Sequence, residues 1–173
     1  DKIISWEALI KQSESLDDPD KLQAVNNFFN REYRFLDDQQ NWHEEDYWAT
    51  PIEALVKGAG DCEDYSLAKY FTLRNLGIPS EQLRITYVKA LALNQAHMVL
   101  TYYPTPSSDP LVLDNLVAEI RPASQRRDLL PVYAFNAEGL YLTGKKSGDS
   151  KKLSRWQDVL KKMRDEGFAV GDG

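Results

Sequence analysis

At 173 residues, with 42% apolar and 28% charged residues, the chain has the length and composition of a single soluble globular domain with a sizeable core. Its net charge of −6 argues against a dedicated nucleic-acid binder, because such proteins neutralise phosphates with clustered lysine and arginine. The sequence has no apolar run of about 18 residues, so it predicts no membrane-spanning segment, and its one cysteine allows no internal disulfide.

Helical spacing of apolar residues and capping signals predict a series of helices before residue 80. The clearest start is at Thr50, which forms a capping box with Glu53 and is followed by Pro51 at the first helical position; Gly58 is a natural stop. A polar and aromatic stretch over residues 36–49 is expected to be a loop. The predicted helices are 3–14, 18 to about 35, 50–58 and 62–77.

After Pro79 the pattern changes to short segments rich in Val, Tyr, Leu and Ile and bounded by turn residues, which predict strands. The lysine pairs at 145–146 and 151–152 surround a Gly/Ser-rich turn and are expected to lie in a solvated loop. A last helix is expected after Ser154, ending at Gly167. The predicted strands are 83–89, 96–103, 111–117, 131–136 and 139–143.

This order of elements predicts one α+β domain over residues 1–173, with N-terminal helices packed on a C-terminal antiparallel sheet. Its helical part covers about 1–80, a β-meander about 81–145, and a C-terminal helix about 154–167. Cys62 lies at the start of the helix that precedes the strands.

The only cysteine lies in the sequence GDCEDY at residues 60–65, where a glycine-marked turn opens a helix. A thiol at a helix N-terminus is close to unpaired backbone N–H groups and to the positive end of the helix dipole, which favour the thiolate. The Cys62 N–H is also placed to stabilise an oxyanion. A lone cysteine is more often a small buried apolar residue, but the glycine and acidic residues around Cys62 do not make an apolar core position. We therefore expect Cys62 to be a nucleophile.

His97 and Asp114 supply the imidazole and the carboxylate that a thiol nucleophile needs, in the chain order Cys, His, Asp. If residues 104–107 form a four-residue hairpin loop, His97 stands opposite Asp114 on one face of the sheet. A loop of another length would break this pairing. The alternatives are a structural histidine in a strand and an aspartate in a turn; the second histidine, His43, lies in a polar loop.

Three carboxylates beside the thiol oppose its ionisation by like-charge repulsion: Asp61, Glu63 and Asp64. Carboxylates with backbone carbonyls suit Ca²⁺, which would relieve this repulsion. The spacing does not match an EF-hand loop, however, and acidic helix starts are common without any metal. For a second oxyanion donor the candidates are the indole N–H groups of Trp48 and Trp42, with core packing as the alternative role.

Three segments in this order resemble the motifs of the bacterial transglutaminase-like cysteine proteinases: 60–65 (GDCEDY), 96–100 (AHMVL) and 112–116 (VLDNL). Two flanking segments fit as well, 47–51 (YWATP) and 127–133 (RDLLPVY). The resemblance covers roughly residues 20–145. It implies a papain-like or transglutaminase-like cysteine protease fold of the α+β class.

For the site, the resemblance implies a catalytic triad made of Cys62, His97 and Asp114. It also implies calcium bound close to the catalytic cysteine, with the expected ligands Asp61, Glu63 and Asp64. Ligands outside this acidic segment cannot be placed from the sequence.

For function, the resemblance implies a calcium-dependent periplasmic endopeptidase. It would cleave the N-terminal region of a large surface adhesin at a double-alanine site, releasing the adhesin and promoting biofilm dispersal. An inner-membrane receptor for cyclic-di-GMP would hold it in check by sequestration. The same three residues also suit a transglutaminase or amidase acting on glutamine side chains, and a non-catalytic binding module is a third alternative. Because the sequence begins at Asp1, the lack of a signal peptide does not bear on location.

Overall fold

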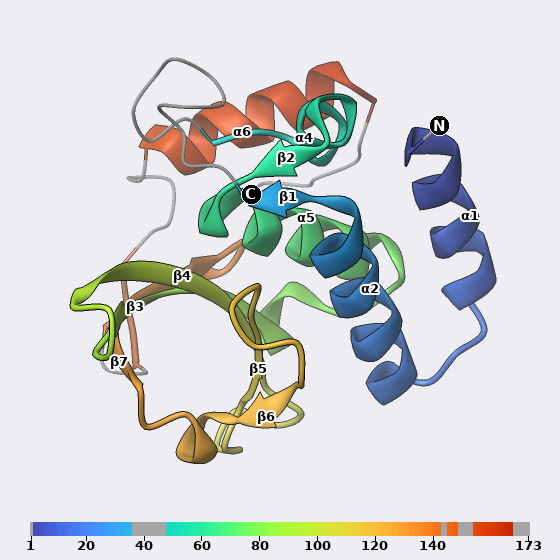
Figure 1. Ribbon diagram of the computed structural model, residues 1–173. Helices are drawn as coiled ribbons and strands as arrows, with labels where there is room; N and C mark the ends of the chain where they lie inside the picture. Colours follow the sequence, from blue (N-terminus) through green and yellow to red (C-terminus); the bar gives the residue numbers. More distant parts are fainter. Residues whose placement is uncertain (1, 36–47, 143–144, 149–153, 168–173) are drawn as a thin grey trace.

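The computed structural model describes residues 2–35, 48–142, 145–148 and 154–167, and it confirms an α+β fold in which helices pack against an antiparallel sheet (Figure 1). The helices are α1 (Lys2–Ser13), α2 (Asp18–Glu32), α4 (Pro51–Lys57), α5 (Cys62–Asn75) and α6 (Ser154–Asp165). The strands are β1 (Arg34–Phe35), β2 (Ala59–Gly60), β3 (Leu83–Ala90), β4 (Gln95–Tyr102), β5 (Leu111–Leu113), β6 (Arg121–Pro122), β7 (Leu129–Asn136), β8 (Gly139–Leu142) and β9 (Lys145–Gly148).

The main sheet has the order β6-β5-β4-β3-β7-β8-β9, with antiparallel neighbours throughout. Strands β3 to β6 follow one another as in a meander, and β7 then returns to pair with the other side of β3. Two expectations are wrong at the level of single strands. β5 ends at Leu113 rather than near residue 117, and residues 145–148 form strand β9, paired with β8, where a loop was expected. Lys151 and Lys152, which were expected in the same loop, lie outside the described residues.

The second helix ends earlier than its apolar pattern suggests. Asp17 caps its start by accepting the Asp20 N–H at 3.0 Å, with Pro19 in the first turn. The helix stops at Glu32, because Tyr33 is extended and the next two residues pair in parallel with β2 as strand β1. The expected helical end near residue 35 is therefore replaced by a short strand beside the segment that leads to Cys62.

The short helix α4 has the start that its sequence predicts. The Thr50 hydroxyl accepts the Glu53 N–H at 3.1 Å, and the Glu53 carboxylate accepts the Thr50 N–H at 2.9 Å. Pro51 occupies the first turn, and Gly58 ends the helix with a φ of 71°, in the left-handed region that glycine adopts without strain. The chain then passes through β2 directly into α5.

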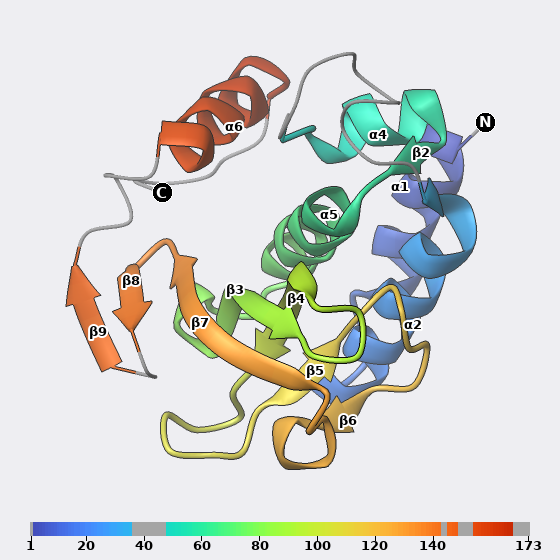
Figure 2. The same ribbon diagram turned by 60° about the vertical axis from the view of Figure 1, so that its left-hand side comes forward.

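Helix α5 lies between the sheet and the other helices (Figure 2). It is buried along most of its length, from residue 64 to residue 73. Trp6 of α1 donates its indole N–H to Thr72 at 3.0 Å, and Trp156 of α6 stacks on Phe71 with ring centroids 5.6 Å apart. The helix that begins with Cys62 is thus the centre of the hydrophobic core, which fixes its first turn relative to the sheet.

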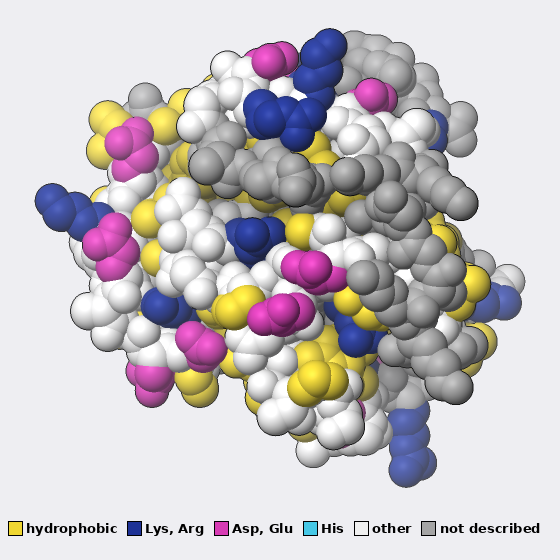
Figure 3. All heavy atoms as spheres, turned by 180° about the vertical axis from the view of Figure 1, so that it is seen from behind, with side chains coloured by type: hydrophobic (Ala, Val, Ile, Leu, Met, Phe, Trp, Pro, Cys, Tyr) yellow, Lys and Arg dark blue, Asp and Glu magenta, His cyan; other side chains and the backbone are white. Residues whose placement is uncertain are grey.

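On the face shown in Figure 3, acidic and basic side chains are interspersed over the part of the chain that the structure describes, and they do not gather into one broad basic area. The prediction that the protein is not a nucleic-acid binder remains a prediction. Within residues 2–35, 48–142, 145–148 and 154–167, no helix combines the length and apolar character that crossing a bilayer requires.

Candidate active site

Cys62 is the first residue of α5, and a reciprocal capping box holds it there. The Asp61 carboxylate accepts the Asp64 N–H at 3.3 Å, and Asp64 Oδ2 accepts the Asp61 N–H at 3.1 Å. Asp64 Oδ1 also accepts the Ala49 N–H at 3.0 Å, which ties the segment before α4 to the start of α5. Gly60 leaves room for this arrangement, because a Cβ at that position would lie 2.7 Å from the Asp64 Cβ.

The surroundings of the thiol do not favour its ionisation. Burial raises the pKa of Cys62 well above its usual range, and the nearby carboxylates of Glu63 and Asp61 raise it further. The Cys62 Sγ lies 3.5 Å from Glu63 Oε2. A hydrogen bond from the Met98 N–H of β4 acts in the opposite direction but is outweighed. The helix N-terminus was expected to lower the pKa of Cys62, but burial and the acidic neighbours raise it by more.

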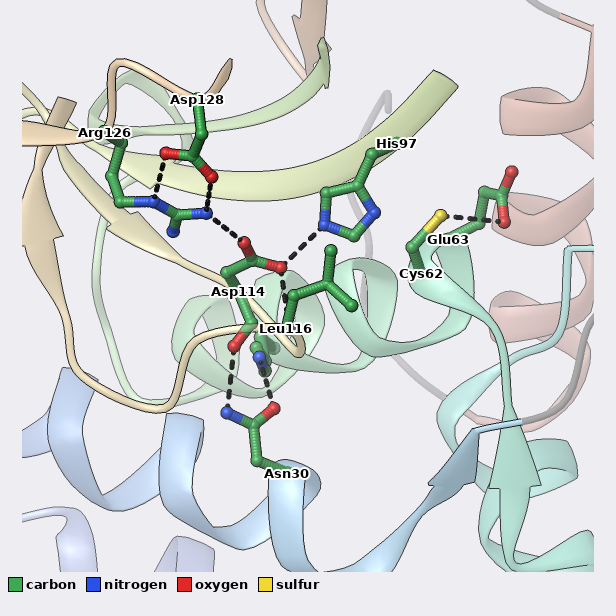
Figure 4. A network of polar contacts seen from close by, with 9 residues as sticks. Asn30, Cys62, Glu63, His97, Asp114, Leu116, Arg126 and Asp128 are labelled. Carbon is green, nitrogen blue, oxygen red and sulfur yellow. Dashed lines mark hydrogen bonds and ion pairs between the residues drawn. The ribbon is translucent and has the colours of Figure 1, made fainter. Parts of the chain in front are cut away.

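His97 lies on β4 and points into the space between Cys62 and Asp114 (Figure 4). Its Nε2 lies 2.7 Å from Asp114 Oδ1, and its other ring nitrogen faces the Cys62 sulfur. An ionised carboxylate only accepts hydrogen bonds, so we assign the ring proton to Nε2, which leaves the lone pair of Nδ1 directed toward the thiol. The structure thus brings together the three side chains that the sequence singled out.

The register that joins β4 to β5 differs from the expected one. Leu100 pairs with Leu113, so the connection spans residues 103–110 rather than four residues, and the strands stop pairing before they reach His97. Relative to the expected register, the position opposite His97 shifts by two residues. Because side chains along a strand alternate with a period of two, the side chains of His97 and Asp114 still lie on the same face of the sheet. Asp114 follows the last residue of β5 and reaches His97 diagonally. The contact was predicted, but the register behind it was wrong.

Asp114 is also a turn residue, as the alternative interpretation held. Its Oδ1 accepts the Leu116 N–H at 3.0 Å, while its Oδ2 accepts a hydrogen bond from Arg126 Nη2 at 2.8 Å. Burial alone would raise the pKa of Asp114, but the contacts with His97, Leu116 and Arg126 outweigh it and lower the pKa to about 2. The carboxylate is therefore ionised at neutral pH.

Sequence reasoning gave no role to Arg126, Asn30 and Lys69, nor to Asp128, which it noted only within the flanking segment 127–133. Arg126 is only 4% exposed and is itself held by Asp128. Asn30 of α2 donates to the Asp114 backbone carbonyl at 2.9 Å, and Lys69 of α5 donates to Asn30 Oδ1 at 2.8 Å. The only local signal was the Arg-x-Asp pair just before a strand. An asparagine and a lysine within helical patterns give no sign of burial.

The acidic segment was tested for its fit to a cation. No group of three His, Cys, Asp or Glu side chains is arranged to hold a metal within the described ranges of the chain. Both Asp64 oxygens and one Asp61 oxygen already accept backbone N–H groups, yet each carboxylate oxygen has a second lone pair. Burial, with Glu63 nearby, raises the pKa of Asp64 to about 7. A concentration of hard carboxylate oxygen donors is the ligand type that Ca²⁺ prefers.

The structure describes one of the two tryptophans expected to supply a second oxyanion donor. Trp48 is buried and stacks on Phe135, with ring centroids 5.6 Å apart and planes 10° from parallel, which is the core-packing role. Its role as an oxyanion donor remains a prediction. Trp42 and His43 lie outside the described residues.

A thiol at a helix N-terminus that faces an imidazole, with the imidazole held by a buried carboxylate, is the arrangement that papain-like and transglutaminase-like thiol enzymes use for acyl transfer. The family comparison agrees with this class. The model of the bacterial transglutaminase-like cysteine proteinases matches residues 7–128, and the chain belongs to this family. The resemblance stated from the sequence motifs is thus confirmed, together with the fold that it implied.

Among solved structures, the chain is similar to LapG from Legionella pneumophila at 49% identity and a TM-score of 0.86, over 94% of this chain and 87% of that one. Calcium-bound LapG matches at 47% identity and a TM-score of 0.85, over 94% and 89%. EGTA-treated LapG matches at 48% identity and a TM-score of 0.87, over 94% and 88%. The comparison with curated proteins gave no match.

Proposed function

We propose that this protein is a calcium-dependent cysteine endopeptidase, with Cys62 as nucleophile, His97 as general base and Asp114 as the residue that orients His97. One observation carries the proposal. The His97 ring lies between the other two residues, with Nε2 2.7 Å from Asp114 Oδ1 and Nδ1 facing the Cys62 sulfur, as a general base for this thiol requires (Figure 4).

The chemistry begins with transfer of the Cys62 thiol proton to His97 Nδ1. The thiolate attacks the peptide carbonyl carbon, forming a C–S bond, and the Cys62 backbone N–H, which has no acceptor within the helix, stabilises the oxyanion. The C–N bond then breaks as the imidazolium returns its proton to the leaving amine. Water, deprotonated by the same imidazole, hydrolyses the thioester and restores the thiol.

For calcium, the proposal rests on the acidic residues around the nucleophile and on the likeness to LapG, for which a calcium-bound structure exists. Asp61 and Glu63 would hold the ion together with the lone pairs that remain on Asp64. When bound, the cation supplies positive charge that offsets these carboxylates. The residues themselves oppose thiolate formation, since Glu63 and Asp61 raise the pKa of Cys62. The proposed calcium site therefore lies at the carboxylates whose negative charge opposes ionisation of the Cys62 thiol.

For substrate, partner and location, the proposal follows the sequence motifs and the 49% identity to LapG over 94% of the chain. The substrate is the N-terminal region of a large surface adhesin, and its cleavage releases the adhesin and promotes biofilm dispersal. The protease acts in the periplasm and is regulated by sequestration on an inner-membrane receptor for cyclic-di-GMP.

Proteolysis of an adhesin N-terminal fragment tests this proposal, using wild type and Cys62→Ala with and without EGTA. Cleavage by wild type, abolished by Cys62→Ala and by chelator, is expected. Cleavage that persists in chelator would contradict the calcium requirement. Adding a primary amine separates the two acyl-transfer alternatives, because amine incorporation without cleavage would identify a transglutaminase. Unchanged biological activity of Cys62→Ala would instead identify a binding module.

A further inference from the structure

The two carboxylate oxygens of Asp114 have separate partners. Oδ1 faces His97 and the Leu116 N–H, whereas Oδ2 accepts only the hydrogen bond from Arg126 Nη2 at 2.8 Å among the contacts of the described residues. The side chain of Asp114 is fully buried, and that of Arg126 is 4% exposed. In such a site a lone carboxylate would be strongly destabilised, and Arg126 is the side chain that contacts its second oxygen, adding to the hydrogen bonds from His97 and the Leu116 N–H.

Arg126 is in turn fixed by a second carboxylate. Its Nε and Nη2 donate to the two oxygens of Asp128 at 3.1 and 3.0 Å, a two-point contact that sets the plane of the guanidinium. The Asp128 backbone carbonyl accepts the Leu91 N–H at 2.8 Å, which anchors this loop to the end of β3. The Asp128 side chain is 47% exposed. A continuous chain of contacts therefore runs from the surface through Arg126 and Asp114 to His97 (Figure 4).

We propose that Arg126 is a positioning residue for the reaction, acting on His97 through Asp114, and that Asp128 positions Arg126. This inference rests on the proposed function of Cys62, His97 and Asp114. With Oδ2 held by Arg126, the plane of the carboxylate is fixed and Oδ1 stays directed at His97 Nε2, so the ring is kept with Nδ1 toward the thiol. A lysine carries the charge but not the planar fork, so it cannot contact both aspartates in the same way.

The variants follow from this geometry. Arg126→Met is expected to lower kcat by about 10- to 100-fold with little change in KM, as is typical when the partner that orients a site residue is lost. Arg126→Lys should recover part of that loss. Asp128→Asn keeps one hydrogen-bond acceptor at a partly exposed position and should give a smaller fall in kcat. Arg121→Met is the matched control, because the exposed side chain of Arg121 pairs with Glu119 at 3.0 Å.

The experiment combines kinetics with a spectroscopic readout. In wild type, the downfield proton resonance of His97 Nε2–H reports its hydrogen bond to Asp114, and His43→Gln removes the ambiguity between the two histidines. This resonance should shift or broaden in Arg126→Met and in Asp128→Asn and stay in place in Arg121→Met. Thermal unfolding checks folding, and if Arg126→Met does not fold, Arg126→Lys and Asp128→Asn provide the test.

The outcomes separate the two proposals. If wild type cleaves its substrate and folded Arg126 and Asp128 variants match it in kcat and in the His97 resonance, the positioning role is wrong and the protease function stands. If wild type does not cleave but the resonance responds to these variants and not to Arg121→Met, the protease function fails while the positioning of His97 by Arg126 stands.

Discussion

His97 Nε2 and Asp114 Oδ1 lie 2.7 Å apart, and both side chains are shielded from solvent. In this environment the hydrogen bond is stronger than at a surface, and its loss leaves charged groups without compensation. The contact sets the tautomer of the imidazole and so decides which ring nitrogen is available to Cys62.

Asp114→Asn is expected to lower kcat by about 10³- to 10⁴-fold, because an amide no longer selects the tautomer with its proton on Nε2. The change also removes one of the two carboxylates that contact the buried Arg126, leaving Asp128, so the free energy of unfolding should fall. Steady-state cleavage and urea unfolding measure the two effects. Asp109→Asn, at an exposed position that contacts Ser124, is the control. A kcat within threefold (about 0.6 kcal/mol) of wild type would exclude the orienting role of Asp114.

Glu63→Gln and Asp61→Asn are expected to weaken calcium binding by at least about tenfold and to lower activity in parallel. Asparagine still caps a helix, so Asp61→Asn separates the loss of charge from the loss of the cap at α5. Calcium titration by calorimetry and cleavage rates at fixed calcium are the measurements. Their unfolding in EGTA should resemble that of wild type. Full calcium affinity in both variants would place the ion elsewhere.

Lys69 should make stability depend on pH. Burial lowers its pKa from 10.5 to about 7 in the folded protein. Between these values the unfolded chain binds one more proton than the folded one, so Lys69 makes the free energy of unfolding rise with pH, by at most about 1.4 kcal/mol per pH unit. Below about pH 7 the raised pKa of Asp64 gives a slope of the opposite sign. Urea unfolding in EGTA from pH 7.5 to 8.5 therefore measures the contribution of Lys69.

Lys69→Met should remove this slope, and Lys89→Met, at an exposed position of β3, should keep it. Above that pH window the raised pKa of Cys62 gives a slope of the opposite sign, which is why the upper limit is chosen. An identical slope in Lys69→Met and wild type would show that Lys69 is not the group responsible.

Gly60→Ala is expected to lower both stability and activity. The added Cβ would lie 2.7 Å from the Asp64 Cβ and 3.0 Å from its Oδ2, so the capping box must shift and Cys62 with it. A cost of about 1–3 kcal/mol in the free energy of unfolding is typical of such overcrowding. Gly77→Ala is the comparison, because that position has a φ of 96° but open space, so it should lose stability with kcat unchanged. Equal kcat in both variants would contradict the proposed link between Gly60 and the nucleophile.

The sequence predicts a structural feature well when that feature depends on residues close together in the chain, and poorly when it depends on contacts between distant segments. The start of α4 was predicted in detail because Thr50 and Glu53 cap each other within a single turn that has Pro51 at its first position. The end of α2 was not, because the parallel pairing of β1 with residues 59–60 overrides its helical pattern.

The site shows the same division. Cys62 could be placed at a helix start from its neighbours alone, and His97 and Asp114 from the pattern of the strands. The register between β4 and β5 depends on an eight-residue connection whose length no local signal fixes. Arg126 and Lys69 were missed because burial of a charged side chain results from tertiary packing, not from the residues beside it in the chain.

Two tryptophans from distant parts of the chain, Trp6 and Trp156, contact neighbouring residues of the same helix, Thr72 and Phe71. During synthesis, α5 is complete about eighty residues before Trp156 is added, so its apolar surface stays open while the whole sheet is being made. A chain cut before residue 154 would lack Trp156 and leave Phe71 without its stacking partner, so we expect such a chain to aggregate.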